Sequence, residues 1–221
     1  MSENEKSEKS LVLSYLELRR TIGVLGIILP LALLAGALIV FHTDLQNSIS
    51  AYYYTGMRDV LVGTLVAFGV FLFSYKGYPG DAIYGKIACA AAIGVALFPT
   101  APREQASDTA RIVGYGHLFF SSIFFATLTY FSLRLFTKSD QDTLPPKKRQ
   151  RNLVYIICGI LMALCLLGIL LVFFLPGGEG WLGGYAVFWF ETAAIWAFGV
   201  SWFVKGEAIA LLNDPVEPEK G

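Results

Sequence analysis

Long apolar runs, separated by short polar stretches, occupy most of the chain. A bilayer core about 30 Å thick requires about 20 apolar residues in helical form to cross it. Six apolar segments fit this requirement, at residues 21–41, 59–75, 83–98, 112–136, 153–175 and 183–204. They lack the alternation of barrel strands, and open strands would leave backbone groups unsatisfied in lipid. The pattern therefore predicts an all-α, polytopic membrane protein built as a bundle of six transmembrane helices.

The polar stretches are too short to form a separate soluble domain. Residues 1–20 are expected to form a cytoplasmic N-terminal segment, in which residues 11–18 make a short interfacial helix. Residues 21–204 form the transmembrane domain, and residues 205–221 form a cytoplasmic tail that is disordered from residue 213 on. The first apolar run is interpreted as a retained span rather than a cleaved signal peptide, because it is long for a signal and more apolar residues follow its small ones.

The distribution of Lys and Arg predicts the orientation, since cytoplasmic loops carry an excess of these residues. If the N-terminus lies inside, only Arg58, Arg103 and Arg111 of the 17 Lys and Arg residues fall outside. An odd number of spans would move Lys205 to the outside. Six spans with both termini in the cytoplasm therefore fit best. The basic run 147–151 on the inner side either only fixes this topology or also contacts anionic lipid head groups.

Small residues indicate where helices approach one another closely, because lipid gives two helices little hydrophobic reason to associate. The third segment carries small residues on every face, which predicts a central position in the bundle. In the sixth segment, a group of small residues predicts a close-packed stretch: Ala193, Ala194, Ala197 and Gly199.

Charged residues make up only 15% of the chain, against about 25% in an ordinary soluble domain, and the formal net charge is zero. These values exclude a disordered chain and a nucleic-acid-binding protein that relies on positive charge. Cys89, Cys158 and Cys165 lie in apolar runs without metal-binding or redox spacing, so they are interpreted as buried apolar residues. We expect no cofactor and no metal. The expected partners are membrane lipids, and homo-oligomerisation is left open.

Polar side chains at membrane depth are costly and therefore indicate functional sites. In the outer half they are Arg58, Asp59, His117 and Glu191, with Ser50 in the first outer loop. Glu191 lies among aromatic residues about 12 Å into the sixth segment, at about 1.5 Å per residue, where a carboxylate needs a partner. If the bundle closes, these side chains line an outward-facing polar pocket. We therefore expect the protein to bind a lipid or small amphiphile there.

Each candidate also has a purely structural interpretation. The helix dipole favours Asp59 in the first turn of a helix, and Arg58 would serve as an interfacial anchor. His117 would be a hydrogen-bonded residue near the interface, and Glu191 would form a structural pair with His117 or Arg58. Two histidines without HxxxH or HExxH spacing do not make a metal site.

Four motifs, SISAYYYTGMRDVLVG, YKGY, ALFPT and GYGH, resemble those of a family of small bacterial six-helix membrane proteins known only as a domain of unknown function. That family is distantly similar to the Frag/DRAM-type membrane proteins. The resemblance extends from about residue 15 to residue 204. It implies the six-helix fold but no reaction. We expect the protein to lie in the inner (plasma) membrane.

Ser50, Asp59 and His117 also resemble part of the set of Ser, Asp and His residues that surrounds zinc in the alkaline ceramidase and progestin-receptor superfamily. The chain departs from that superfamily in having six expected spans rather than seven and in lacking the late histidine pair. This resemblance implies an alternative function, a membrane-embedded hydrolase of lipid amides or esters. A further alternative is a proton-coupled transporter with Glu191 as the proton carrier, although the two halves of the chain are not similar. The sequence therefore does not decide whether the protein is an enzyme.

Overall fold

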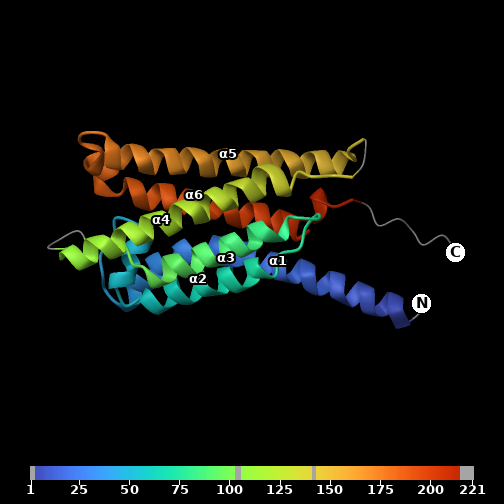
Figure 1. The fold of residues 1–221 in the computed structure, drawn as a ribbon, viewed down its shortest axis with the longest axis horizontal. Coiled ribbons are helices and arrows are strands. Elements are labelled where there is room, and N and C mark those ends of the chain that lie inside the picture. The colour runs from blue at the N-terminus through green and yellow to red at the C-terminus, as the bar shows by residue number, and fades with distance from the viewer. Residues whose placement is uncertain (1–2, 103–105, 141–142, 215–221) are drawn as a thin grey trace.

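The computed structural model describes residues 3–102, 106–140 and 143–214, and this part of the chain is helical without any β-strand (Figure 1). Its α-helices are α1 (Glu3–Ala35), α2 (Arg58–Phe73), α3 (Ala82–Leu97), α4 (Asp108–Tyr130), α5 (Pro146–Phe174) and α6 (Ala186–Lys205). Short π-helical turns extend α1 and α4, at Gly36–Val40 and Phe131–Leu135. The predicted all-α fold is thereby confirmed.

Four stretches of the described chain are long and apolar enough to cross a membrane: Ser10–Val40, Asp108–Leu135, Pro146–Phe174 and Ala186–Lys205. They cover α1, α4, α5 and α6, which agrees with the prediction of a helical membrane protein. Helices α2 and α3 contain 16 residues each. This corresponds to about 24 Å at about 1.5 Å per residue, less than a full hydrocarbon core. The count of six spans therefore stays a prediction.

The helices form a closed ring in which each packs against its neighbours in sequence. Helix α6 closes the ring, because it packs extensively against both α5 and α1. The expected central position of the third segment is wrong, since α3 packs mainly between α2 and α4. The start of α1 and the end of α6 lie at one end of the bundle, here called the terminal end (Figure 1). Loops 41–57 and 175–185 lie at the opposite end, here called the loop end.

Helices α1 and α6 touch through their backbones. A Cβ atom on Gly199 would lie 2.9 Å from the carbonyl oxygen of Gly23, and one on Gly23 would lie 2.8 Å from the carbonyl oxygen of Gly199. The indole Nε1 of Trp196 donates a hydrogen bond of 3.1 Å to the carbonyl oxygen of Ile27, which fixes the register of the two helices. Such close contact maximises van der Waals attraction between helices in lipid. The predicted close packing of the sixth segment is confirmed at Gly199.

Local sequence signals account for the ends of several helices. The Ser107 side chain caps α4 by accepting a hydrogen bond of 3.2 Å from the amide of Ala110. Pro146 lies in the first turn of α5, where its missing N–H would be unpaired in any case. The residues expected to form a separate interfacial helix, 11–18, are part of one continuous α1. Neither Gly nor Pro interrupts this helix before Gly23, so nothing in the sequence ends it there.

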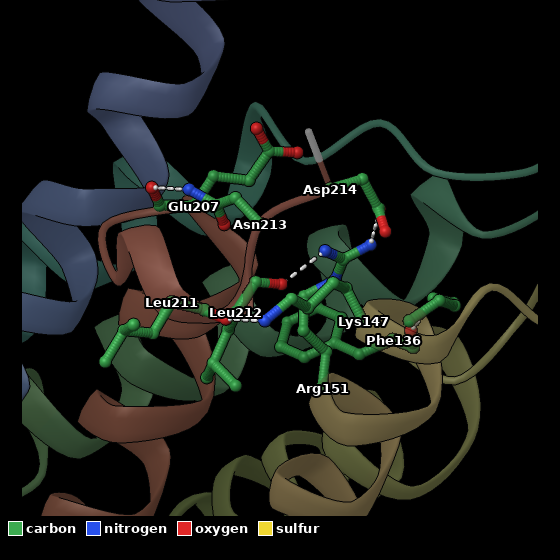
Figure 2. A network of polar contacts seen from close by, with 9 residues as sticks. Phe136, Lys147, Arg151, Glu207, Leu211, Leu212, Asn213 and Asp214 are labelled. Atoms are coloured by element: carbon green, nitrogen blue, oxygen red, sulfur yellow. Dashed lines mark hydrogen bonds and ion pairs between the residues drawn. The ribbon is translucent and has the colours of Figure 1, made fainter. Parts of the chain in front are cut away.

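The chain turns back against the bundle after α6 (Figure 2). The guanidinium of Arg151, near the start of α5, donates a hydrogen bond of 2.6 Å to the carbonyl oxygen of Leu212. The same guanidinium pairs with the carboxylate of Asp214 at 2.8 Å. Residues 206–214, including the start of the stretch expected to be disordered, are thus fastened to the bundle. Residues 215–221 of the expected tail lie outside the described residues.

Candidate functional site

The loop between α1 and α2, residues 41–57, folds over the loop end of the bundle and is here called the plug loop. Its Asn47 carbonyl oxygen accepts a hydrogen bond of 3.0 Å from the amide of Phe188, at the start of α6. The hydroxyl of Tyr54 donates a hydrogen bond of 2.7 Å to the carbonyl oxygen of Thr100, beyond the end of α3. Partial burial raises the pKa of Tyr54, so this hydroxyl is a donor at neutral pH. The plug loop is therefore fixed at two separate points of the ring.

Three of the predicted site residues, Ser50, His117 and Glu191, meet beneath the plug loop. Ser50 begins a short 3-10 helix in that loop, His117 lies early in α4, and Glu191 lies early in α6. His117 Nε2 lies 3.0 Å from Ser50 Oγ, and Ser50 Oγ lies 3.4 Å from Glu191 Oε1. The other carboxylate oxygen, Oε2, accepts a hydrogen bond of 2.6 Å from the amide of Ile49. The cluster therefore joins one loop to two helices of the ring.

Two backbone groups complete the cluster, each where a helix begins or ends. Phe98 follows α3 in an extended conformation, and its carbonyl oxygen accepts a hydrogen bond of 2.8 Å from His117 Nδ1. Ile49 precedes the 3-10 helix, where a backbone amide lacks a helical partner, and Glu191 supplies the acceptor instead. Ile49 is 3% exposed and His117 is 5% exposed, so water is not available to replace these hydrogen bonds.

The hydrogen bonds restrict where the protons of the cluster lie. A carbonyl oxygen only accepts, so His117 Nδ1 carries a hydrogen. If Nε2 accepts the hydroxyl hydrogen of Ser50, a protonated Glu191 donates to Ser50 Oγ. If Nε2 donates instead, Ser50 donates to an ionised Glu191. Both arrangements have zero net charge and differ only by a movement of protons along Ser50, and a neutral cluster is far less costly at membrane depth than a single buried charge.

A narrow cavity extends from this cluster into the middle of the ring. Ile49, Ser50 and Glu191 form its polar end with Ser121, and the remaining walls are apolar side chains of α1, α2, α3, α4 and α6. From Glu191 to Phe198 the cavity follows α6 for about 10 Å, at about 1.5 Å per residue. The cavity volume is about 40 Å³, which is room for about three water molecules. The cavity is therefore a narrow slot, and its lining side chains would have to move apart to admit an apolar chain.

The other two predicted site residues, Arg58 and Asp59, lie apart from this cluster on the surface at the start of α2. Their side chains are 57% and 96% exposed, and they approach each other to 3.6 Å. The Arg58 guanidinium also stacks on the Tyr53 ring, 5.6 Å from its centre. The five predicted site residues thus divide into a buried group of three and an exposed pair. Glu191 contacts the plug loop rather than Arg58.

The donor set for a zinc ion is not assembled. Across residues 3–102, 106–140 and 143–214, no three His, Cys, Asp or Glu side chains lie close enough to hold a metal ion together. Of the set implied by the ceramidase resemblance, Ser50 and His117 meet, but Asp59 lies on the surface. A catalytic zinc ion generally requires three protein ligands. The residues present therefore do not fit one.

Sequence reasoning missed the two backbone groups and the slot. The Ile49 amide and the Phe98 carbonyl carry no side-chain signal, because every residue except proline offers the same pair of groups. One usable signal is Pro99, since the residue before a proline avoids the helical conformation and so presents its carbonyl outside the helix. The slot is lined from five helices, so spacing along the chain does not locate it.

No family model, curated protein or solved structure matches this chain. The resemblance to the six-helix family therefore stays a prediction that rests on four short motifs.

Proposed function

We propose that the protein binds a single-chain lipid or small amphiphile inside the helix ring. The polar end of the ligand contacts Ser50 and Glu191, with His117 holding Ser50 in place, and its apolar chain lies in the slot. The observation that carries this proposal is a buried polar cluster at one end of an otherwise apolar slot. Ligand sites commonly combine mostly apolar walls with a few placed polar groups.

The hydrogen-bonding capacity that the cluster leaves unused indicates the head group. Glu191 Oε1 lies 3.4 Å from Ser50 Oγ, near the limit of a hydrogen bond, so it can accept a shorter hydrogen bond from a ligand. The Ser121 hydroxyl donates to the carbonyl oxygen of Leu118 at 3.2 Å but keeps its acceptor lone pairs. A ligand hydroxyl or ammonium group would satisfy these acceptors. A ligand carboxylate would be repelled by Glu191 in its ionised form.

The proposal includes six spans in the inner membrane, with both termini in the cytoplasm. Helices α2 and α3 pack in the ring between α1 and α4, and each presents large apolar side chains outward, among them Val66, Val70, Ile83 and Ile87. These side chains require a lipid environment as much as those of the longer helices do. Helices of 16 residues cross by thinning the bilayer locally, which costs a fraction of a kcal/mol per Å. The plug loop would then face the outside.

Thermal stability of the full chain in lipid nanodiscs tests this proposal. The probes are a straight-chain alcohol, amine and carboxylate of equal length. We expect the alcohol and the amine to raise the melting temperature, because both donate a hydrogen bond to Glu191, and we expect no rise with the carboxylate. Glu191→Gln removes the negative charge that attracts the ammonium group. In this variant the amine should therefore raise the melting temperature no more than the alcohol does.

Asp59→Asn is the matched control, because it removes an exposed carboxylate from the same end of the bundle without touching the slot. The effect of the amine should persist in this variant. Equal stabilisation by all three probes would indicate simple partitioning into the bilayer. That result, or an equal loss of the amine effect in both variants, would contradict the proposal.

A membrane-embedded hydrolase is the second candidate, and one observation favours it. Ser50 Oγ and His117 Nε2 lie 3.0 Å apart, within the range for a nucleophile and its base, and Phe98 orients the imidazole ring. Glu191, however, bonds Ser50 and the Ile49 amide rather than His117 Nδ1. It thereby occupies an N–H donor that an oxyanion would use, so hydrolysis requires the carboxylate to move.

A serine-reactive fluorophosphonate probe separates the two candidates. A hydrolase predicts labelling of Ser50 that is lost in His117→Ala, since the imidazole activates the hydroxyl. Absence of labelling in the wild-type protein, together with stabilisation by the amine, would eliminate the hydrolase and leave the binding function.

A further inference from the structure

Four cationic side chains from three helices gather at the terminal end of the bundle: Arg19 of α1, Lys148 and Arg151 of α5, and Lys205 of α6. Lys205 is repelled by each of the other three charges. Helix α6 ends at Lys205, and the apolar stretch of α5 begins at Leu153, directly after Arg151 and Asn152. The cluster therefore lies at the level of the lipid head groups, whichever side of the membrane this end faces.

Two of these cations already have acceptors. Arg151 donates to the carbonyl oxygen of Leu212 and pairs with Asp214 (Figure 2). Lys148 donates a hydrogen bond of 2.8 Å to the carbonyl oxygen of Phe136. The position of both side chains is thereby fixed, and a carboxylate compensates the charge of Arg151.

The other two cations have no acceptor within the described part of the chain. Arg19 Nε is buried without a hydrogen-bond partner, and its guanidinium stacks on the Tyr15 ring, 4.2 Å from the ring centre. Lys205 Nζ contacts aromatic faces, at 5.4 Å from the ring centre of Phe136 and 6.0 Å from that of Tyr155. Arg19 Nε is thus withdrawn from water without an acceptor, which is costly.

Two buried N–H donors of the described chain lack a partner at this end, Arg19 Nε and Trp202 Nε1, and the acceptors that also lack one are the uncharged amide oxygens of Asn152 and Asn213. Trp202 lies one turn before Lys205 on α6, its Nε1 is buried without a partner, and its ring packs 5.1 Å from that of Phe136. Arg19, Lys205 and Trp202 together present N–H groups and positive charge. Among the described residues, Glu207 is the carboxylate that attracts Lys205, and it does not hydrogen-bond to it. The cluster therefore lacks a negatively charged group that accepts several hydrogen bonds.

We propose that Arg19, Lys148 and Lys205 bind a phosphate-type oxyanion, carried either by the head group of an anionic phospholipid or by a soluble phosphate. Arg binds a phosphate through its planar fork of N–H groups, and Lys binds it as a point charge. The bound oxyanion offsets the repulsion within the cluster and gives Arg19 and Lys205 the acceptor that each lacks. The site lies at the end of the bundle opposite the slot, so it does not depend on the proposed binding of an amphiphile.

The test uses the full chain in nanodiscs at low ionic strength, with the melting temperature as the readout. One arm compares phosphatidylcholine with a mixture of phosphatidylcholine and phosphatidylglycerol. The other arm adds inorganic phosphate to phosphatidylcholine nanodiscs, against chloride at equal ionic strength. We expect a rise of about 5–10 °C at a ligand concentration about a hundred times the Kd. A rise with phosphatidylglycerol alone identifies a lipid head group, and a rise with inorganic phosphate identifies a soluble ligand.

Three variants locate the effect. Lys205→Met and Arg19→Gln should lose the rise, whereas Arg149→Gln should keep it, because Arg149 is an exposed cation on the same end of α5 and lies outside the cluster. In pure phosphatidylcholine, Lys205→Met should be at least as stable as the wild type, since it removes a cation that lacks an acceptor.

Lower stability of Lys205→Met in phosphatidylcholine would mean that the charge is already compensated, and it would overturn the proposal. If Arg149→Gln lost the rise in melting temperature as fully as Lys205→Met, the rise would come from the general positive charge of this surface. That result would also contradict the proposed site. The absence of a rise in both arms for the wild type would also overturn it.

Discussion

The hydrogen bond between Ile49 and Glu191 allows a quantitative test of how the plug loop is held. Glu191→Ala removes the acceptor of a 2.6 Å hydrogen bond, while Ile49, at 3% exposure, keeps its amide away from water. Stranding a buried donor of this kind costs about 1–3 kcal/mol. For a domain of this size, a loss of about 2 kcal/mol corresponds to a fall of about 4–8 °C in the melting temperature.

Glu191→Gln separates hydrogen bonding from charge. The amide oxygen of Gln can still accept from the Ile49 amide, and its NH₂ group can donate to Ser50, whose hydroxyl then donates to His117. We therefore expect a loss below about 1 kcal/mol for this variant. Asp59→Ala, at a carboxylate that is 96% exposed, should change stability by less than about 0.5 kcal/mol.

The assay is equilibrium unfolding in a mild detergent, combined with limited proteolysis of residues 41–57. Glu191→Ala should expose the plug loop to the protease as well as lower the free energy of unfolding, because the bond that it removes fixes that loop. If Glu191→Gln were as unstable as Glu191→Ala, the charge of the carboxylate would matter more than its hydrogen bonds, and the reasoning would be refuted.

Three further predictions concern the rest of the fold. Gly199→Ala should destabilise the protein by about 1–3 kcal/mol in detergent unfolding, because its Cβ would lie 2.9 Å from an α1 carbonyl oxygen, whereas Gly63→Ala, with no atom within 4 Å of the new Cβ, should stabilise it by about 0.5–1 kcal/mol. Ser107→Ala should cost about 1 kcal/mol in the same assay, through loss of the α4 cap. The hydrogen bond to Asp81 raises the pKa of Lys138 above 10.5, so the stability from this pair is present below that pH and is lost as the pH rises through the higher value in the folded state. Lys138→Arg stays charged, and its unfolding curve should therefore fall less steeply than that of the wild type above about pH 10.5.

Much of the fold follows from local rules. Apolar runs of sufficient length predict helices in lipid, and the structure has a helix in each of the six predicted segments. The close contact at Gly199 also followed from its lack of a side chain. The central position expected for α3 failed because small residues allow close packing but do not say against which helix. The ring order depends on contacts between segments far apart in sequence, such as α1 with α6, and no local pattern encodes these.

The sequence predicted the candidate site only where the cost of burying a polar side chain without a partner decides where that side chain lies. A carboxylate or an imidazole inside an apolar segment needs a partner, which is why Glu191 and His117 were recognised. The same rule misjudged Arg58 and Asp59, because both stand at the first turn of α2, where long or charged side chains reach the surface and meet each other. Whether a polar residue at the edge of a span turns inward depends on the loop that covers it. The plug loop is held in place by residues far from it in sequence, so no local pattern predicts its fold.

The plug loop also links closure of the site to ligand binding. Ile49 and Ser50 belong to the plug loop and to the polar end of the slot at once, so a ligand that takes the oxygens of Glu191 competes with the bonds that hold the loop closed. The apparent affinity is then the intrinsic affinity multiplied by the fraction of molecules in which the loop is open, so a more open loop binds more tightly. Tyr54→Phe removes the hydrogen bond to Thr100 at the other end of the loop without changing any residue that lines the slot.

A partly exposed hydrogen bond of this kind contributes about 0.5–1 kcal/mol, so Tyr54→Phe should tighten binding of the amine probe by about 2–5-fold while it lowers the stability of the ligand-free protein. Titration of the probe into wild-type and variant nanodiscs measures the first effect, and unfolding in detergent measures the second. A loop that merely covers a preformed site predicts unchanged affinity, and a loop that forms part of the site predicts weaker binding. The opposite movement of stability and affinity is therefore specific to a loop that competes with the ligand for Glu191.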